Sequence, residues 1–138
     1  MKISTRGRYA LRMLLDIANH QDQGVVRLAE VAERQKISKK YLEQIVVLLR
    51  GEELLVGHRG NRGGYTLARD PKDITLDTIL KVTENEDHLI PCTDPDYCER
   101  SDYCLTRNMW LELEEMIHKF FAHITLEDLR TGRRKLNL

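Results

Sequence analysis

The apolar positions of the first 51 residues repeat with the spacing of amphipathic helices. Steps of three and four predict one helix within residues 4–20 and a short second one that ends near residues 35–37. Ser38 is a favourable N-cap for a third helix, which ends at Gly51. The apolar positions are Ala10, Met13, Leu14 and Ile17, then Leu28, Val31 and Ala32, then Leu42, Ile45, Val46 and Leu49. Two short helices joined by a brief turn are typical of a helix-turn-helix.

Two short apolar runs, 54–56 and 65–67, flank the glycine-rich segment 57–64 and predict a β-hairpin. After the helix-turn-helix pattern such a hairpin is a wing, and its glycines let the backbone lie close to a duplex. Arg59 and Arg62 then lie at the tip, where a minor groove would be. A plain hairpin would simply expose these arginines to solvent. A further helix around residues 76–82, with Thr75 as its N-cap, completes a mainly α fold with a small β-wing over residues 1–83.

The last third of the chain divides into a loop and a long amphipathic helix. Residues 84–104 have no periodicity and are rich in acidic residues and cysteine, so we expect a loop. Residues 105–129 are expected to form a dimerisation helix and a C-terminal element, and residues 130–138 a disordered tail. The apolar face of this helix is too rich for solvent, and we expect a second copy to cover it, core packing within one chain being the alternative. Its predicted interface residues are Met109, Trp110, Leu113, Met116, Ile117, Phe120 and Phe121.

A formal net charge of zero hides a strong asymmetry along the chain. Residues 1–72 carry 14 basic and 8 acidic side chains, whereas residues 73–126 carry 4 and 12. This distribution suits a DNA-binding protein of which only one end meets phosphate, although an unevenly charged solvated surface would look the same. The chain shows neither a secretion signal nor an apolar run long enough to cross a membrane, so we expect a cytoplasmic protein.

Cys92, Cys98 and Cys104 lie within 13 residues, with five residues in each gap. An odd number in a cytosolic chain disfavours a disulfide framework, and the acidic and proline neighbours disfavour inert buried thiols. Metal ligation by soft thiolates remains, and the loose spacing fits an iron-sulfur cluster better than structural zinc. Zinc and redox-sensing thiols stay open at this point. An enzyme is not expected, since the chain has no convincing nucleophile-base pair and no phosphate-cradling glycine motif.

Several motifs together resemble the IscR-type winged-helix regulators of iron-sulfur cluster biogenesis, relatives of the nitric oxide sensor NsrR and the iron regulator RirA. The similarity runs nearly from end to end of the chain. It is carried by residues 4–10 (STRGRYA), Ile37-Ser38, Tyr41-Leu42-Glu43-Gln44, Arg59-Gly60, Gly63-Gly64-Tyr65, the three cysteines, Cys104-Leu105-Thr106 and Trp110. The resemblance implies a homodimer that binds palindromic promoter sites, holds a cluster through three cysteines per subunit and couples cluster occupancy to promoter choice.

Carried over by position, the resemblance places Glu43 and Gln44 at base edges in the major groove and Arg59 in the minor groove. Chemistry agrees, because Gln can bond adenine through two hydrogen bonds, Glu accepts from the cytosine amino group and narrow minor grooves attract Arg. Lys39 and Lys40 suit phosphate or guanine. The expected DNA-contacting residues are Ser38, Lys39, Lys40, Tyr41, Glu43, Gln44, Arg59, Gly60, Asn61 and Arg62.

The sequence departs from the IscR pattern at the fourth cluster ligand. A His three residues after the last cysteine completes the cluster in that family, and here this residue is Arg107, a poor ligand. The aspartate that NsrR offers is matched by Arg8. Other candidates are water, a residue of the second subunit, or His88, Asp96, Glu99, Asp102 and Asn108. By resemblance we expect a 2Fe-2S cluster and a sensor of cluster status. The alternatives are a nitric oxide or iron sensor with a 4Fe-4S cluster, and a metal-free, thiol-responsive repressor of the same fold.

Overall fold

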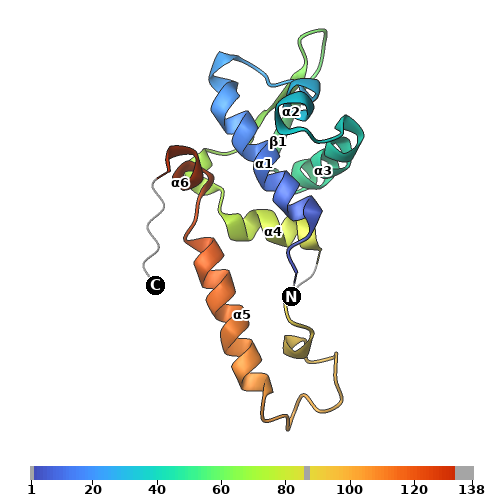
Figure 1. Ribbon diagram of the computed structural model, residues 1–138, viewed down its shortest axis with the longest axis vertical. Coiled ribbons are helices and arrows are strands. Elements are labelled where there is room, and N and C mark those ends of the chain that lie inside the picture. The colour runs from blue at the N-terminus through green and yellow to red at the C-terminus, as the bar shows by residue number, and fades with distance from the viewer. Residues whose placement is uncertain (1, 86–87, 133–138) are drawn as a thin grey trace.

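A computed structural model describes residues 2–85 and 88–132 of the chain. A bundle of short helices carries a two-stranded hairpin at one end and a long projecting helix at the other (Figure 1). The elements are α1 (Thr5–His20), η1 (Gln21–Gln23), α2 (Leu28–Gln35), α3 (Lys39–Gly51), β1 (Leu55–His58), β2 (Gly64–Leu67), η2 (Pro71–Asp73), α4 (Leu76–Glu84), η3 (Pro91–Thr93), α5 (Arg107–Ala122) and α6 (Leu126–Thr131). No helix in the described ranges is long and apolar enough to span a membrane.

Helices α1, α2 and α3 form the predicted helix-turn-helix with its supporting helix. Most of their periodic apolar side chains are buried in one core, and Met13, Leu14, Leu42 and Ile45 are completely buried. The hydroxyl of Ser38 accepts a hydrogen bond from the backbone N–H of Tyr41, which satisfies one of the unpaired donors at the start of α3. The predicted cap therefore fixes where the third helix begins.

The hairpin β1–β2 is the predicted wing. Its strands are antiparallel, with Leu55 opposite Leu67 and His58 opposite Gly64. Val26, in the segment before α2, exchanges both backbone hydrogen bonds with Tyr65, at 2.9 and 2.8 Å. A Cβ atom at Gly64 would lie 2.5 Å from the carbonyl oxygen of Val26, so only glycine fits this approach. The wing is thus joined directly to the start of the helix-turn-helix.

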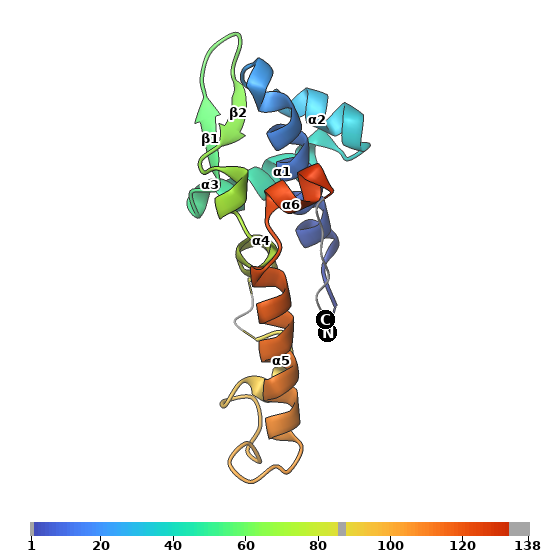
Figure 2. The ribbon, with the colours of Figure 1, turned by 90° about the vertical axis from the view of Figure 1, so that its left-hand side faces the viewer.

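Helix α5 extends away from the wing, and the cysteine loop lies at its far end (Figures 1 and 2). Its C-terminal end returns to the core, where a bridge between Thr75 and Thr125 pairs the segment before α4 with the segment before α6. Leu126 of α6 is buried in the same core as α1. The loop and the wing therefore occupy opposite ends of one connected framework.

Helix α5 ends at Ala122, and Ile124, just beyond it, is buried where its carbonyl accepts a hydrogen bond from the N–H of Leu76. One expectation for the C-terminal region needs correction. Arg130 and Thr131, expected in the disordered tail, form the end of α6, with Gly132 as its C-cap. The rest of that expected tail, residues 133–138, lies outside the described residues.

A buried carboxylate joins α1 to α2. The Asp16 side chain accepts hydrogen bonds from Arg34, the shortest at 2.6 Å, and from Gln35 at 2.8 Å. Burial alone would raise the Asp16 pKa, but the bonds from Arg34 and Gln35 outweigh it and hold the pKa below its ordinary value. This ion pair fixes the first helix of the helix-turn-helix on the core.

We expect Asp16→Asn to lower the free energy of unfolding at neutral pH by about 2–4 kcal/mol, because Arg34 loses its buried partner. A carboxylate whose pKa is depressed by folding stabilises the fold above its unfolded pKa, near 3.8, and loses that contribution as the pH falls through the folded value. Urea unfolding at pH 7 and pH 3 should therefore show the difference between variant and wild type shrinking in acid. The exposed Asp22→Asn serves as control, and an equal difference at both pH values would contradict the assignment.

Candidate nucleic-acid interface and cysteine loop

The third helix presents one polar face to solvent. Lys39, Lys40, Glu43 and Gln44 are exposed on α3, while the periodic apolar positions of the same helix are buried. Ser38, although exposed, is occupied as the helix cap. The residues predicted to read DNA on α3 therefore share one accessible surface.

Tyr41 has a different environment from its polar neighbours on α3. Its half-buried ring meets the ring of Tyr9 edge to face at 5.7 Å, and the guanidinium of Arg12 lies 5.2 Å from the centre of the Tyr9 ring. The contact between the two rings holds α3 against α1, and the Arg12 guanidinium packs on the Tyr9 ring within α1. The predicted DNA contact of Tyr41 can involve only the exposed part of this side chain.

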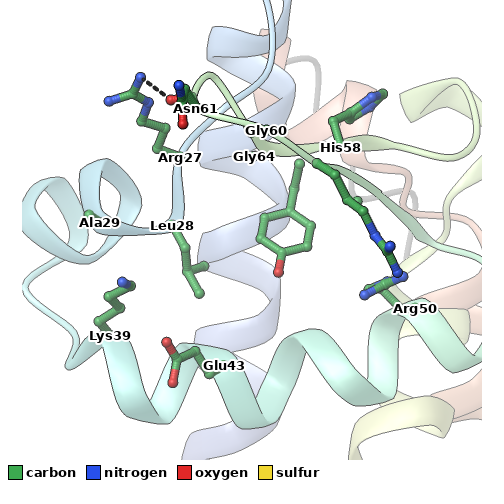
Figure 3. A pocket seen from close by; sticks show the side chains of 14 residues that line it. Arg27, Leu28, Ala29, Lys39, Glu43, Arg50, His58, Gly60, Asn61 and Gly64 are labelled. Atoms are coloured by element: carbon green, nitrogen blue, oxygen red, sulfur yellow. Dashed lines mark hydrogen bonds between the residues drawn. The ribbon is translucent and has the colours of Figure 1, made fainter.

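A groove of about 530 Å³ separates α3 from the wing (Figure 3). Lys39 and Glu43 reach into it from α3, and Arg50 lies further along the same helix. On the opposite wall, Arg27 donates a hydrogen bond to the backbone carbonyl of Asn61 at 3.2 Å, which ties the wing to the start of α2. The groove is lined by Arg27, Leu28, Ala29, Lys39, Glu43, Arg50, Gly57, His58, Arg59, Gly60, Asn61, Gly63, Gly64 and Tyr65.

The groove brings predicted and unpredicted residues together. Arg59, Gly60 and Asn61 line it as parts of the wing, whereas Arg62, at the exposed tip, does not. Two further cationic side chains, Arg27 and Arg50, line the groove without having been predicted. Arg50 could have been found, because it lies seven residues after Glu43 and so on the same side of the helix. Arg27 could not, since only the Val26–Tyr65 pairing brings it to the wing.

The three cysteines are free thiols on one segment. Cys92 and Cys98 are exposed and Cys104 is partly buried. Across residues 2–85 and 88–132, no three cysteine, histidine or acidic side chains are gathered closely enough to hold a metal ion. The Cys104 pKa is lowered by hydrogen bonding with the side chain and backbone of Thr106, whose hydroxyl is 3.3 Å from the sulfur, with Arg107 and Arg100 contributing. Thiols with a lowered pKa are better ligands and nucleophiles.

The turn that carries Cys92 is attached to α5. Leu89 and Ile90 donate their backbone N–H groups to the buried carboxylate of Glu114, the latter at 3.2 Å. Arg107 donates to the backbone carbonyl of Thr93 at 3.0 Å. The residue at the position of the family's histidine ligand therefore holds the loop instead.

The candidate fourth ligands differ in availability. The His88 ring contacts the buried side chains of Thr93 and Glu114. The other four candidates face solvent: Asp96, Glu99, Asp102 and Asn108 are exposed. His88 is therefore already engaged by the loop and α5, whereas the exposed candidates could turn toward a cluster without breaking a buried contact.

One side of α5 carries a stripe of exposed apolar side chains. Met109 is 52%, Leu113 39% and Met116 67% exposed, at spacings that place them on one face. Trp110, Ile117 and Phe120 are partly buried. Phe121 instead lines a small cavity with Leu80, Leu89 and His118 of the same chain. The structure thus separates the predicted interface into an exposed stripe and residues that pack at least partly within the subunit.

Three helices, a wing tied to the second helix and a basic groove between the wing and α3 define a winged-helix DNA-binding protein. The sequence matches, over residues 3–132, a family described as iron-dependent transcriptional regulators, Rrf2. The chain belongs to the Rrf2 family. Like its named relatives, it is a DNA-binding transcription regulator of the helix-turn-helix type, and it is not an enzyme.

Individual relatives support this assignment. The regulators IscR of Pectobacterium atrosepticum and Sodalis glossinidius are 35% and 37% identical to the chain over all of its 138 residues and 84% of their own length. The structure of T. potens IscR superimposes with a TM-score of 0.79 at 33% identity, covering 100% of this chain and 92% of that one. CymR, described as the global cysteine regulator of B. subtilis, gives 0.79 at 31% identity, covering 96% and 98%.

Proposed function

We propose that this protein is a homodimeric, cytoplasmic regulator that senses an iron-sulfur cluster, as an IscR-type regulator does, and controls genes of cluster biogenesis. The observation that carries the proposal is the position of the three thiols. Their loop is tied to α5 through Arg107, and the C-terminal end of α5 leads into the bridge between Thr75 and Thr125 in the core. Ligand geometry and subunit geometry then share one rigid element, which is what a ligand-driven change of dimer shape requires.

The donor set suits such a cluster. Three accessible, free thiols on one loop are soft ligands, and the lowered pKa of Cys104 favours its thiolate. Cys92, Cys98 and Cys104 would hold the cluster, and binding would have to draw them together. A bound cluster supplies an iron-dependent, redox-active state that the apoprotein lacks. We favour 2Fe-2S, with 4Fe-4S as the alternative, and leave the fourth ligand to a residue other than Arg107.

The DNA-binding part of the proposal follows from two symmetric copies. Pairing through Met109, Leu113 and Met116 would present two α3 helices to the half-sites of a palindrome. Glu43 and Gln44 would then meet base edges, while Lys39 and Arg50 would meet phosphate. Arg59 would enter the minor groove.

The test compares wild type with a variant in which all three cysteines are serine. After anaerobic reconstitution with iron and sulfide, we expect charge-transfer absorption bands and Mössbauer signals from wild type alone. We also expect apo and holo wild type to rank the same promoter fragments differently in fluorescence anisotropy. Pale wild-type protein, or promoter preferences unchanged by the cluster and by the serine substitutions, would overturn the proposal.

A second candidate is a metal-free, thiol-responsive repressor, favoured by the accessible thiols and the lowered Cys104 pKa. It predicts colourless, metal-free protein whose DNA affinity changes on oxidation and no longer does so once the cysteines are serine. The same spectra and binding curves therefore distinguish the two candidates.

A further inference from the structure

Glu114 is a buried acidic residue on a helix whose other glutamates, Glu112 and Glu115, are exposed. The residue is only 7% exposed, and its carboxylate meets the backbone just before the cysteine-bearing turn. One oxygen accepts from the N–H groups of Leu89 and Ile90, and the other lies 3.4 Å from the His88 ring. A carboxylate is buried at high cost unless it is hydrogen-bonded, so this position needs those donors.

The same turn is held from its other side. Thr93 is 1% exposed, and its hydroxyl donates to the carbonyl of Ile90 at 2.7 Å and meets the His88 ring at 3.1 Å. Arg107, seven residues before Glu114 on α5, donates to the Thr93 carbonyl. Residues seven apart lie on one face of a helix, so a single face of α5 grips the turn at both ends. Cys92 lies between these attachments.

The Glu114 attachment is both buried and ionised. Burial alone would raise the Glu114 pKa, but hydrogen bonding by Thr93, Ile90, Leu89 and His88 keeps the pKa below its usual value, so the group is ionised at neutral pH. Charge-assisted hydrogen bonds are shorter and stronger than neutral ones. An apolar side chain could fill the same space, but it would not orient two successive backbone N–H groups.

We propose that Glu114 is the positioning residue for Cys92: it locks the 88–93 turn on α5, so that Cys92 is the fixed thiol onto which the segment carrying Cys98 and Cys104 closes. This role of Glu114 rests on the proposed cluster function, and it means that the 88–93 turn already has its final position before the cluster binds. Cys98 lies in an exposed segment between that turn and α5, and Cys104 adjoins α5. Cluster formation then requires a rearrangement of that segment alone.

The test uses Glu114→Ala, Glu114→Gln and, as matched control, Glu115→Ala, which removes an exposed glutamate from the next position of the helix. In the metal-free protein, hydrogen exchange of the Leu89 and Ile90 amides should accelerate about tenfold or more in Glu114→Ala, consistent with the loss of charge-assisted bonds. In reconstituted protein, iron loss to a chelator should accelerate about 10- to 100-fold, the usual cost of losing a group that orients a ligand.

Glu114→Gln keeps an oxygen acceptor and should restore most of both properties, whereas Glu115→Ala should match wild type. Thermal unfolding of the three variants identifies any that fail to fold. If Glu114→Ala does not fold, the amide exchange and iron loss of Glu114→Gln test the positioning role. Faster amide exchange with an unchanged cluster spectrum and unchanged iron loss would show a merely structural tie and overturn the inference while the proposed function stands. Wild type that never takes up a cluster would overturn the proposed function itself, and the positioning role of Glu114 with it.

Discussion

Replacing Lys39 and Arg50 together by alanine is expected to weaken binding to duplex DNA by about 100-fold and to flatten its salt dependence. Both side chains line the groove between α3 and the wing and project from one exposed helix face. Removing one cation from a phosphate should reduce the slope of log affinity against log salt by about one, hence by about four for two variant subunits in the proposed dimer. Because alanine favours the helix, the free energy of unfolding should change little. Fluorescence anisotropy between about 50 and 200 mM salt measures both effects.

The matched control removes two positive charges elsewhere. Lys72 follows the wing and Lys119 lies on α5, so the variant Lys72→Ala with Lys119→Ala has the same net charge but an intact groove. It should bind DNA with nearly the wild-type salt slope. If both double variants lose the same affinity for DNA, the groove has no specific role in DNA binding and only the net charge of the protein matters.

Met116→Asp is expected to convert the proposed dimer to a monomer and to abolish tight binding to the palindromic site that we propose. Met116 is the most exposed member of the α5 stripe that contains Met109 and Leu113. Symmetry would double the effect, because the proposed dimer would bury Met116 twice, and the variant would place two carboxylates in that interface. We expect the dimer dissociation constant to rise by at least about 100-fold, measured by analytical ultracentrifugation.

Lys119→Asp provides the control, because it places the same carboxylate on the polar side of α5 beside Glu115. It should remain dimeric. A Met116→Asp protein that still sediments at twice the mass of the chain would exclude this face as the interface. Binding to a half-site should survive in the monomer, since α3 and the wing are untouched.

Local rules account for most of the fold. Apolar residues at every third or fourth position of α1 and α3, and caps such as Ser38, predict the helix-turn-helix. Both signals can be found in the sequence because they involve residues that are close along the chain. The end of α5 was harder to predict. Ile124 continues the helical spacing and is buried, yet it belongs to the bridge with the segment before α4. Periodicity reports which residues are buried and not what covers them.

The same limit explains the site residues that could not be predicted. The cysteines are close in sequence, so their loop was evident. His58 and Arg27 are distant in the sequence and line one groove only because Val26 pairs with Tyr65. Glu114 stands in a run of glutamates, and nothing local distinguishes the one that turns inward. Tertiary contacts, which composition and spacing do not encode, decide these cases.

The attachment of both loop ends to α5 has a consequence for how such regulators diversify. Glu114 and Arg107 grip the 88–93 turn, and Cys104 adjoins the first turn of the same helix. The intervening residues can therefore be lengthened, shortened or exchanged for another ligand set without disturbing the hydrophobic core or the groove. We expect that this segment could hold a different ligand while the DNA-binding surface of α3 and the wing stays the same.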